Sequence, residues 1–219
     1  MESLAALLDK GLARLAIDLD AAARLRLLDY MALLRKWSAK TNLIAKNASD
    51  AEIVEHFLDS LTLLPLLPDT PETRLMDVGS GAGFPGLVLA AARPALFVNL
   101  VEPRQKRAAF LRQVTRSFGL ENVACHECRL EDITPGSVLC SHITSRAVAD
   151  LAGFLHMCEP WLAAGVQIIA MKSRKWRQEL AAAQTIIDRL GLGEPRVSSY
   201  RLPFSGAERV TLVCTASVG

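Results

Sequence analysis

The chain has 219 residues, of which 51% are hydrophobic and 22% charged, and its formal net charge is +2. This length and apolar content suffice for one buried core, and the small net charge does not by itself indicate a nucleic-acid partner. No run approaches the roughly 18 apolar residues of a membrane span, and the charged N-terminus does not resemble a signal peptide, so we expect a cytoplasmic protein without a membrane partner.

The N-terminal third of the chain shows the spacing of amphipathic helices. Apolar residues recur three and four positions apart over residues 4–15 and again over 25–35. A polar stretch at residues 38–42 is predicted to end the second helix. The next helix begins after Ser49, where Glu52 stands three positions later and can complete a capping box.

The helix that follows Ser49 has two distinct sides. His56 and Asp59 lie on one side, about one turn apart, and their spacing alone favours a solvated polar face. The other side is an apolar stripe, formed by Ile53, Phe57, Leu61 and Leu64. This stripe is expected to face the core.

From residue 69 the pattern changes to short β-rich runs separated by helical ones, which is typical of a parallel sheet with crossover helices. The last two runs have no helix between them and are expected to pair as an antiparallel hairpin. The predicted strands span residues 74–78, 96–102, 122–126, 142–145, 166–172, 197–202 and 209–215. The pattern resembles the α/β fold of Rossmann-like class I S-adenosylmethionine-dependent methyltransferases, a seven-stranded, mostly parallel sheet with helices on both faces. We expect this domain over 69–219, after a helical extension over 1–68.

A glycine-rich loop, LMDVGSGAGFPG, follows the first predicted strand. Counted from Gly81, it fits G-x-G-x-x-G, the fingerprint of dinucleotide binding, so an NAD(P)-dependent oxidoreductase is an alternative. Counted from Asp77, it fits D-x-G-x-G-x-G. An acid beside the loop would repel a pyrophosphate but favours the sulfonium and ammonium groups of S-adenosylmethionine. We therefore expect Asp77, Gly79, Gly81 and Gly83 to receive the methionine part of that cofactor.

Glu102 ends the second predicted strand, about twenty positions beyond the glycine loop. An acid at this place accepts hydrogen bonds from ribose hydroxyls, so it indicates an adenosine ligand without choosing between the two cofactors. The choice of S-adenosylmethionine depends on Asp77, on the register of the glycines and on the closing hairpin.

The end of the fourth predicted strand, where this fold brings substrate to the methyl group, carries no mark of amine or pyrimidine C5 methylation. It has no [DNS]-P-P-[YF] turn, and Cys140 comes too early to be a nucleophile there. Guanine N7 has an accessible lone pair and needs only alignment and exclusion of water. Arg146 suits this task, because its planar fork can fix a phosphate, a base edge or the cofactor's carboxylate. A salt bridge at the strand end is its alternative role.

The remaining patterns concern cysteines and basic residues. Cys125 and Cys128 form a C-x-x-C, but no second pair or suitably spaced histidine completes a zinc site, so no metal is expected. Three basic clusters are candidate phosphate contacts, although such runs are usually solvated helix faces. The clusters are Arg35, Lys36, Lys40 and Lys46; Arg104, Lys106, Arg107, Arg112 and Arg116; and Lys172, Arg174, Lys175 and Arg177.

Motifs spread over nearly the whole chain resemble the bacterial 16S ribosomal RNA guanine-N7 methyltransferase family, also called glucose-inhibited division protein B. The motifs are Trp37 with Asn42-Leu43, His56-Phe57-Leu58-Asp59-Ser60, the stretch from Asp77 to Gly86, Lys106-Arg107 with Phe110-Leu111, Ser145-Arg146-Ala147, and Lys172. The resemblance implies methyl transfer from S-adenosylmethionine to N7 of a guanine in 16S ribosomal RNA of the small ribosomal subunit. We expect a monomer. Ile44 and Ser38 depart from the family's usual threonine and asparagine, which affects local polar contacts in that loop.

The resemblance also implies roles for individual residues. Those implied to surround the cofactor are Gly79, Phe84, Leu130, Glu131 and Arg146, with Leu130 and Glu131 beside the adenine. His56 and Asp59 are placed on a helix that faces the site. Asn42 is placed near the substrate, and Lys172 at a phosphate or active-site contact. A methyltransferase of small molecules and a non-catalytic RNA-binding protein with the same fold are further alternatives.

Overall fold

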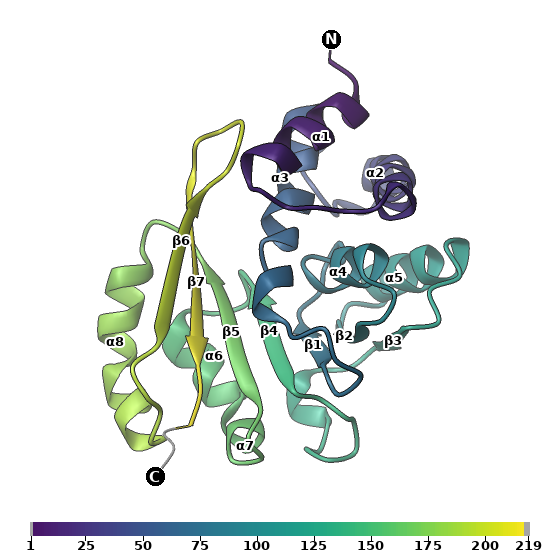
Figure 1. Cartoon of the computed structure of the whole chain (residues 1–219). Helices are drawn as coiled ribbons and strands as arrows, with labels where there is room; N and C mark the ends of the chain where they lie inside the picture. The colour runs from purple at the N-terminus through teal and green to yellow at the C-terminus, as the bar shows by residue number, and fades with distance from the viewer. Residues whose placement is uncertain (1, 217–219) are drawn as a thin grey trace.

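A seven-stranded sheet runs through the computed structural model, which describes residues 2–216 (Figure 1). The strand order is β3-β2-β1-β4-β5-β7-β6, with β1 to β5 parallel and β7 antiparallel to both of its neighbours. The strands are β1 (Arg74–Val78), β2 (Phe97–Val101), β3 (Val123–His126), β4 (His142–Arg146), β5 (Gln167–Lys172), β6 (Arg196–Arg201) and β7 (Glu208–Cys214). Every predicted strand and the closing hairpin are thereby confirmed. The outer limits of the two predicted parts, Met1 and residues 217–219, lie outside the described residues.

Helices cover both faces of this sheet (Figure 1). Helices α4 and α5 pack on one face, where α1, α2 and α3 form a further layer over them, and α6, α7 and α8 pack on the other face. The bounds are α1 Leu4–Arg14, α2 Ala21–Thr41, α3 Asp50–Leu61, α4 Gly86–Ala92, α5 Gln105–Ser117, α6 Leu151–Met157, α7 Glu159–Leu162 and α8 Trp176–Arg189, with short 3-10 turns at Leu64–Leu66 and Leu130–Asp132. No helix within residues 2–216 has the length and apolar character to cross a membrane.

The order of the strands reverses between β1 and β4, which lie side by side although two strands separate them in the chain. In an open parallel sheet, connections on either side of such a reversal run in opposite directions and leave a crevice at the carboxyl ends of the strands. The glycine loop after β1 and Arg146 at the end of β4 lie at this crevice. The topology therefore brings together two motifs that are far apart in the sequence.

Helix α2 continues through the polar stretch that was predicted to end it. The helix ends at Thr41, and Asn42 follows in the left-handed conformation with φ of 46°. Packing explains the difference, because Ser38 is buried and the Trp37 ring lies 5.5 Å from the ring of Phe110 in α5. Tertiary contacts thus override the weak helix preference of the polar residues.

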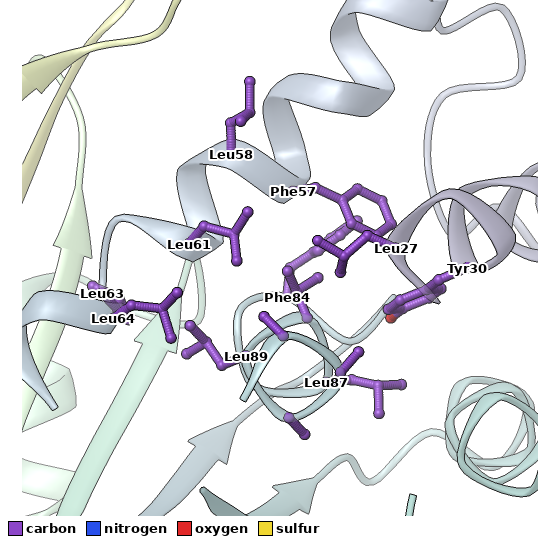
Figure 2. Close-up of a cluster of buried hydrophobic side chains, with 14 of the residues drawn as sticks. Leu27, Tyr30, Phe57, Leu58, Leu61, Leu63, Leu64, Phe84, Leu87 and Leu89 are labelled. Carbon is purple, nitrogen blue, oxygen red and sulfur yellow. The ribbon is translucent and has the colours of Figure 1, made fainter. Parts of the chain in front are cut away.

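Helix α3 begins with the predicted capping box, in which the Glu52 carboxylate accepts the Ser49 N–H and the Ser49 hydroxyl accepts the Glu52 N–H. Its predicted apolar stripe is buried, and Figure 2 shows Phe57 and Leu61 pointing toward Phe84 and the residues of α4. The expectation of a solvated polar face is wrong, because Asp59 is buried as well. Buried side chains therefore surround most of α3, and the core is continuous across the predicted boundary at residue 68.

Candidate functional site

The glycine loop leaves β1 and folds against the carboxyl end of β2. The N–H groups of Gly79 and Ser80 donate to the Val101 carbonyl oxygen at 2.8 and 3.2 Å. The φ angles of Gly79, Gly81 and Gly83 are 69°, 58° and 86°, in the left-handed region that side chains disfavour. The path of the loop therefore depends on glycine at these three positions.

Asp77 lies beneath this loop and is fully buried. Its Oδ2 accepts the N–H of Gly86, the first residue of α4, at 2.9 Å, whereas its Oδ1 has no hydrogen-bond partner among the described residues. Burial raises the pKa of Asp77 to about 7. An unpaired acidic oxygen at this depth suits a cationic cofactor and would be costly beside a pyrophosphate. The bond to Gly86 joins β1 to the start of α4, and direct contact of the carboxylate with the methionine part stays a prediction.

Glu102 joins the loop to the end of β2. Its Oε2 accepts the Gly81 N–H and its Oε1 accepts the Arg104 N–H, both at 2.9 Å. Each carboxylate oxygen has a further lone pair, so the group can still accept hydrogen bonds from ribose hydroxyls. The side chain is held in place by these bonds, which fits its predicted role.

A cavity of about 420 Å³, called here the loop cavity, opens between the glycine loop and the end of β4. Its volume lies in the range of small-molecule sites. The predicted residues that line it are His56, Gly79, Gly81, Phe84, Glu102 and Arg146. Leu43, Ile44 and Arg107 line it as well, so the segment after α2 contributes to its wall together with α3 and α5.

A second cavity of about 480 Å³, called here the β5 cavity, lies at the carboxyl ends of β4 and β5. It shares His56, Arg146 and Ala147 with the loop cavity. Its other lining residues include Asp59, Lys172, Glu179 and Arg209. Two separate spaces thus meet at the side chain of Arg146.

The Arg146 and His56 side chains line both cavities, and the Phe84 ring lies beside them in the loop cavity. The Arg146 guanidinium lies 4.5 Å from the centre of the Phe84 ring, and the His56 ring lies 5.3 Å from the same ring. Burial and the nearby Arg146 lower the pKa of His56 to about 4, so its imidazole is neutral at pH 7. Arg146 also donates to Asp59 Oδ2 at 3.1 Å. It therefore forms the salt bridge that was its alternative role and lines both cavities at once.

Lys172 is paired within the protein. Its Nζ lies 2.8 Å from Glu179 Oε2 and donates to the Ala149 carbonyl oxygen at 2.7 Å. The side chain is 7% exposed and fixes the loop that follows β4. Asn42 is exposed at the end of α2 and lines neither cavity. The predicted substrate contacts of both residues stay predictions.

Leu130 and Glu131 lie in the 3-10 turn after β3, where Leu130 is buried in the core and Glu131 is exposed. Neither residue lines the loop cavity, so their predicted place beside the adenine stays a prediction. Gly83 is likewise behind the cavity wall, where an added Cβ would lie 2.0 Å from the Tyr30 hydroxyl oxygen. Within residues 2–216, no group of three acidic, cysteine or histidine side chains is arranged to hold a metal ion.

Three polar residues of the β5 cavity region were not identified from the sequence: Glu179, Tyr200 and Arg209. Tyr200 and Arg209 belong to the closing hairpin, more than a hundred positions from their partner Asp59 in α3. No local spacing marks such contacts. The only usable signal was the predicted antiparallel pairing of the last two strands, which brings the two residues opposite each other.

Comparison with protein families gives a match over residues 24–201 to the model described as rRNA small subunit methyltransferase G. The chain is 46% identical over 209 residues to Ribosomal RNA small subunit methyltransferase G of Desulfotalea psychrophila, covering 94% of this chain and 95% of the relative. It is 40% identical to the protein of the same name from Chromohalobacter salexigens, covering 89% and 93% of the two chains.

Solved structures share the fold at low sequence identity. The O-methyltransferase TomG from Streptomyces achromogenes, solved with SAM, matches with a TM-score of 0.59 and 13% identity over 95% of this chain and 96% of its own. TYW2 of M. jannaschii, solved with AdoMet, matches with a TM-score of 0.57 and 13% identity over 73% and 74% of the two chains. These likenesses confirm the predicted Rossmann-like methyltransferase fold.

Proposed function

The chain belongs to the rRNA small subunit methyltransferase G family, and we propose that it transfers a methyl group from S-adenosylmethionine to N7 of a guanine in 16S ribosomal RNA. The membership confirms the family inferred from the sequence motifs. It also disfavours the oxidoreductase alternative, because the relatives are named as methyltransferases.

The observation that carries the proposal is the meeting of two cavities at Arg146, His56 and Ala147. The loop cavity contains the glycine loop and Glu102, the groups suited to the methionine and ribose parts of S-adenosylmethionine. The β5 cavity lies on the other side of Arg146, where a flipped-out base could enter. This arrangement places a cofactor and an acceptor base on opposite sides of one shared wall.

Bound S-adenosylmethionine supplies an electrophilic methyl group on a positively charged sulfur. The guanine N7 lone pair forms a bond to the methyl carbon as the carbon–sulfur bond breaks, which leaves S-adenosylhomocysteine and a cationic methylated base. No proton has to be removed from N7, so no general base is required. The pKa of His56, lowered to about 4, makes its imidazole a weak base, which is consistent with this chemistry. The protein's task is to align the reactants and exclude water.

Arg146, Phe84 and His56 perform that task in the proposed mechanism. The Arg146 guanidinium lies 4.5 Å from the centre of the Phe84 ring, and the His56 ring lies 5.3 Å from the same ring. Arg146 projects donors to a site where the O6 oxygen of guanine, beside N7, can accept a hydrogen bond. In this mechanism Arg146, supported by Phe84 and His56, orients the base at the place where the two cavities meet.

Basic residues around the openings support an RNA substrate. Arg104 and Lys106 are exposed beside the loop cavity, and Arg174 and Lys175 are exposed after β5. Such cations contact phosphates and supply affinity without sequence readout. We further propose that the enzyme acts in the cytoplasm, as a monomer and without a metal ion. Light scattering would test the monomer, and activity in the presence of a chelator would test the absence of a metal.

The proposal is tested by incubating the protein with labelled S-adenosylmethionine and small ribosomal subunits, or their naked RNA, from cells that lack this modification. We expect label in 16S RNA with the wild-type protein and none with Arg146→Ala. Label that appears only in a small molecule, or none in either RNA sample, would contradict the proposal. Near-normal transfer by Arg146→Ala would remove the role given to that residue.

A further inference from the structure

We propose that Asp59 is a positioning residue for methyl transfer: it holds Arg146 between the two cavities through a buried carboxylate shared with the closing hairpin. This inference depends on the proposed function, since it concerns how Arg146 is presented to the substrate. It assigns to α3 and to the β6–β7 hairpin a role in alignment beyond packing.

The Asp59 carboxylate is shared by three side chains from three strands. Its Oδ2 accepts Arg146 Nη1 of β4 at 3.1 Å. Its Oδ1 accepts the Tyr200 hydroxyl of β6 at 2.8 Å and lies 3.7 Å from Arg209 Nε of β7. Asp59 is 3% exposed, so these contacts form where water screens them little. These three contacts together set the orientation of the carboxylate.

The contacts restrict the direction of the Arg146 side chain. The guanidinium is held on its edge by Asp59 and on its face by the Phe84 ring. A planar guanidinium fixed on an edge and on a face has little freedom to rotate. Its remaining donors are thereby directed toward the lining of the cavities, where the substrate is expected.

The charges around Asp59 argue against a purely stabilising ion pair. Arg146 and Arg209 are both cations that line the β5 cavity, and they share one carboxylate. A single buried acid between two arginines leaves a net positive charge at the cavity wall. That charge suits a base edge with acceptor atoms.

Glu55 provides the matched control. It lies one turn before Asp59 on α3, is also buried, and its Oε1 accepts the N–H groups of Phe204 and Ser205 in the turn of the same hairpin, at 2.6 and 2.7 Å. Figure 1 shows this turn reaching up beside α3 and α1. Glu55 thus joins the same two elements as Asp59, but it lines neither cavity.

The experiment compares Asp59→Asn with Glu55→Gln in the full-length protein, on RNA that the wild-type enzyme methylates. We expect Asp59→Asn to lower kcat about 30-fold, with KM for RNA and the affinity for S-adenosylhomocysteine within about twofold of wild type, because misalignment affects the reacting geometry and not the phosphate contacts. Glu55→Gln should keep kcat within about twofold. An unchanged kcat in Asp59→Asn, or equal losses in both variants, would overturn the proposal.

A double-variant comparison separates positioning from general weakening. Because Asp59 acts through Arg146, adding Asp59→Asn to Arg146→Lys should lower kcat by less than about twofold beyond Arg146→Lys alone. If the kcat of the double variant were lowered by the product of the two single-variant factors, Asp59 would act independently of Arg146, which would contradict the inference. If Asp59→Asn does not fold, Tyr200→Phe replaces it in the test. Because the Asp59 carboxylate is then held less firmly, we expect kcat to be about threefold lower than that of the wild-type protein. A wild-type kcat in Tyr200→Phe would contradict the inference.

These outcomes are distinct from failure of the proposed function. If the wild-type protein methylates no ribosomal RNA, the function itself fails. If the wild-type protein is active and Asp59→Asn is equally active, only the positioning role fails.

Discussion

At the scale of single residues, the buried Asp77 is a group whose protonation we expect to depend on cofactor binding. The carboxyl group is fully buried, one oxygen has no partner among the described residues, and burial raises its pKa to about 7. A positively charged ligand nearby favours the ionised form and lowers that pKa. Protonation of Asp77 and binding of S-adenosylmethionine should therefore compete.

We predict that S-adenosylmethionine binding at about pH 7 releases a fraction of a proton from Asp77 and tightens as the pH rises from about 6 to 8. Calorimetry in buffers with different ionisation enthalpies measures the released protons. Asp77→Asn should bind without buffer dependence. A binding enthalpy of the wild-type protein that is the same in every buffer would contradict the assignment.

His56 should remain neutral throughout the physiological range. Its pKa is lowered from 6.5 to about 4, so between these values the unfolded chain binds the proton and the folded protein does not. The stabilising contribution is therefore present above the unfolded pKa and is lost as the pH falls from about 6.5 toward 4. Asp77 has the opposite sign over nearly the same interval, because its folded pKa is raised.

The His56 contribution is isolated by comparison with His56→Gln, which retains Asp77. Between about pH 7 and 4.5 the wild-type free energy of unfolding should fall by about 2 kcal/mol more than that of the variant. Urea unfolding at the two pH values measures this difference. Parallel changes in the two proteins would mean that His56 titrates normally in the folded state.

Residues of the site differ in how far the sequence could identify them. The glycine loop and Glu102 occur in local patterns with a known chemical reason, and they do line one cavity. Asp77 was identified by the same pattern, but its place beneath the loop depends on the bond to Gly86 in α4. The contacts of Asp59 could not be predicted, because Tyr200 and Arg209 approach it only after the hairpin has joined the sheet.

At the scale of elements, the glycine loop contains positions that differ in how well they tolerate a side chain. At Gly81 an added Cβ would have no atom closer than 3.7 Å, so only the positive φ opposes a side chain. At Gly83 it would lie 2.0 Å from the Tyr30 hydroxyl oxygen and 2.8 Å from the Leu87 Cβ. The first position faces the loop cavity, and the second faces the packed interior.

We therefore predict that two alanine variants lose stability to different extents. Gly81→Ala should cost only about 1 kcal/mol of stability, from backbone strain, and should mainly weaken cofactor binding. Gly83→Ala should cost about 3 kcal/mol or more, because rigid neighbours must move. Thermal unfolding and S-adenosylhomocysteine titration distinguish the two. Equal stability of the variants would contradict the packing described for Gly83.

The strands were predictable because a parallel sheet with crossover helices leaves a regular alternation in the sequence. The end of α2 was not, because the helix continues through polar residues that are held by packing of Trp37 on Phe110. The buried polar side of α3 was missed for a related reason. From its spacing alone, a carboxylate such as Asp59 is predicted to be solvated. It is buried because Arg146 and Tyr200, which are distant in the sequence, bind it.

At the scale of the whole molecule, the helical extension and the sheet share one core. The Tyr30 hydroxyl donates to the Ala82 carbonyl oxygen of the glycine loop at 2.6 Å, and the Phe57 ring meets the Phe84 ring at 5.3 Å (Figure 2). The extension therefore supports the glycine loop directly. Separation of the two parts would expose these aromatic side chains to water.

We predict that the chain unfolds in a single cooperative transition. A variant that retains Trp37 but carries Trp161→Phe and Trp176→Phe reports on the extension by fluorescence, while far-ultraviolet circular dichroism reports on the whole chain. The two midpoints in urea should coincide, because contiguous cores unfold together. An earlier fluorescence transition would show that residues 1–68 form an independent unit.

The identity of the methylated nucleoside tests the central claim most directly. After reaction with labelled S-adenosylmethionine and unmodified small subunits, the 16S RNA is digested to nucleosides and separated. The proposed transfer to guanine N7 at Arg146 predicts that the label is found in 7-methylguanosine and depends on Arg146. Label in any other nucleoside, or in 7-methylguanosine with the Arg146→Ala protein, would contradict the account.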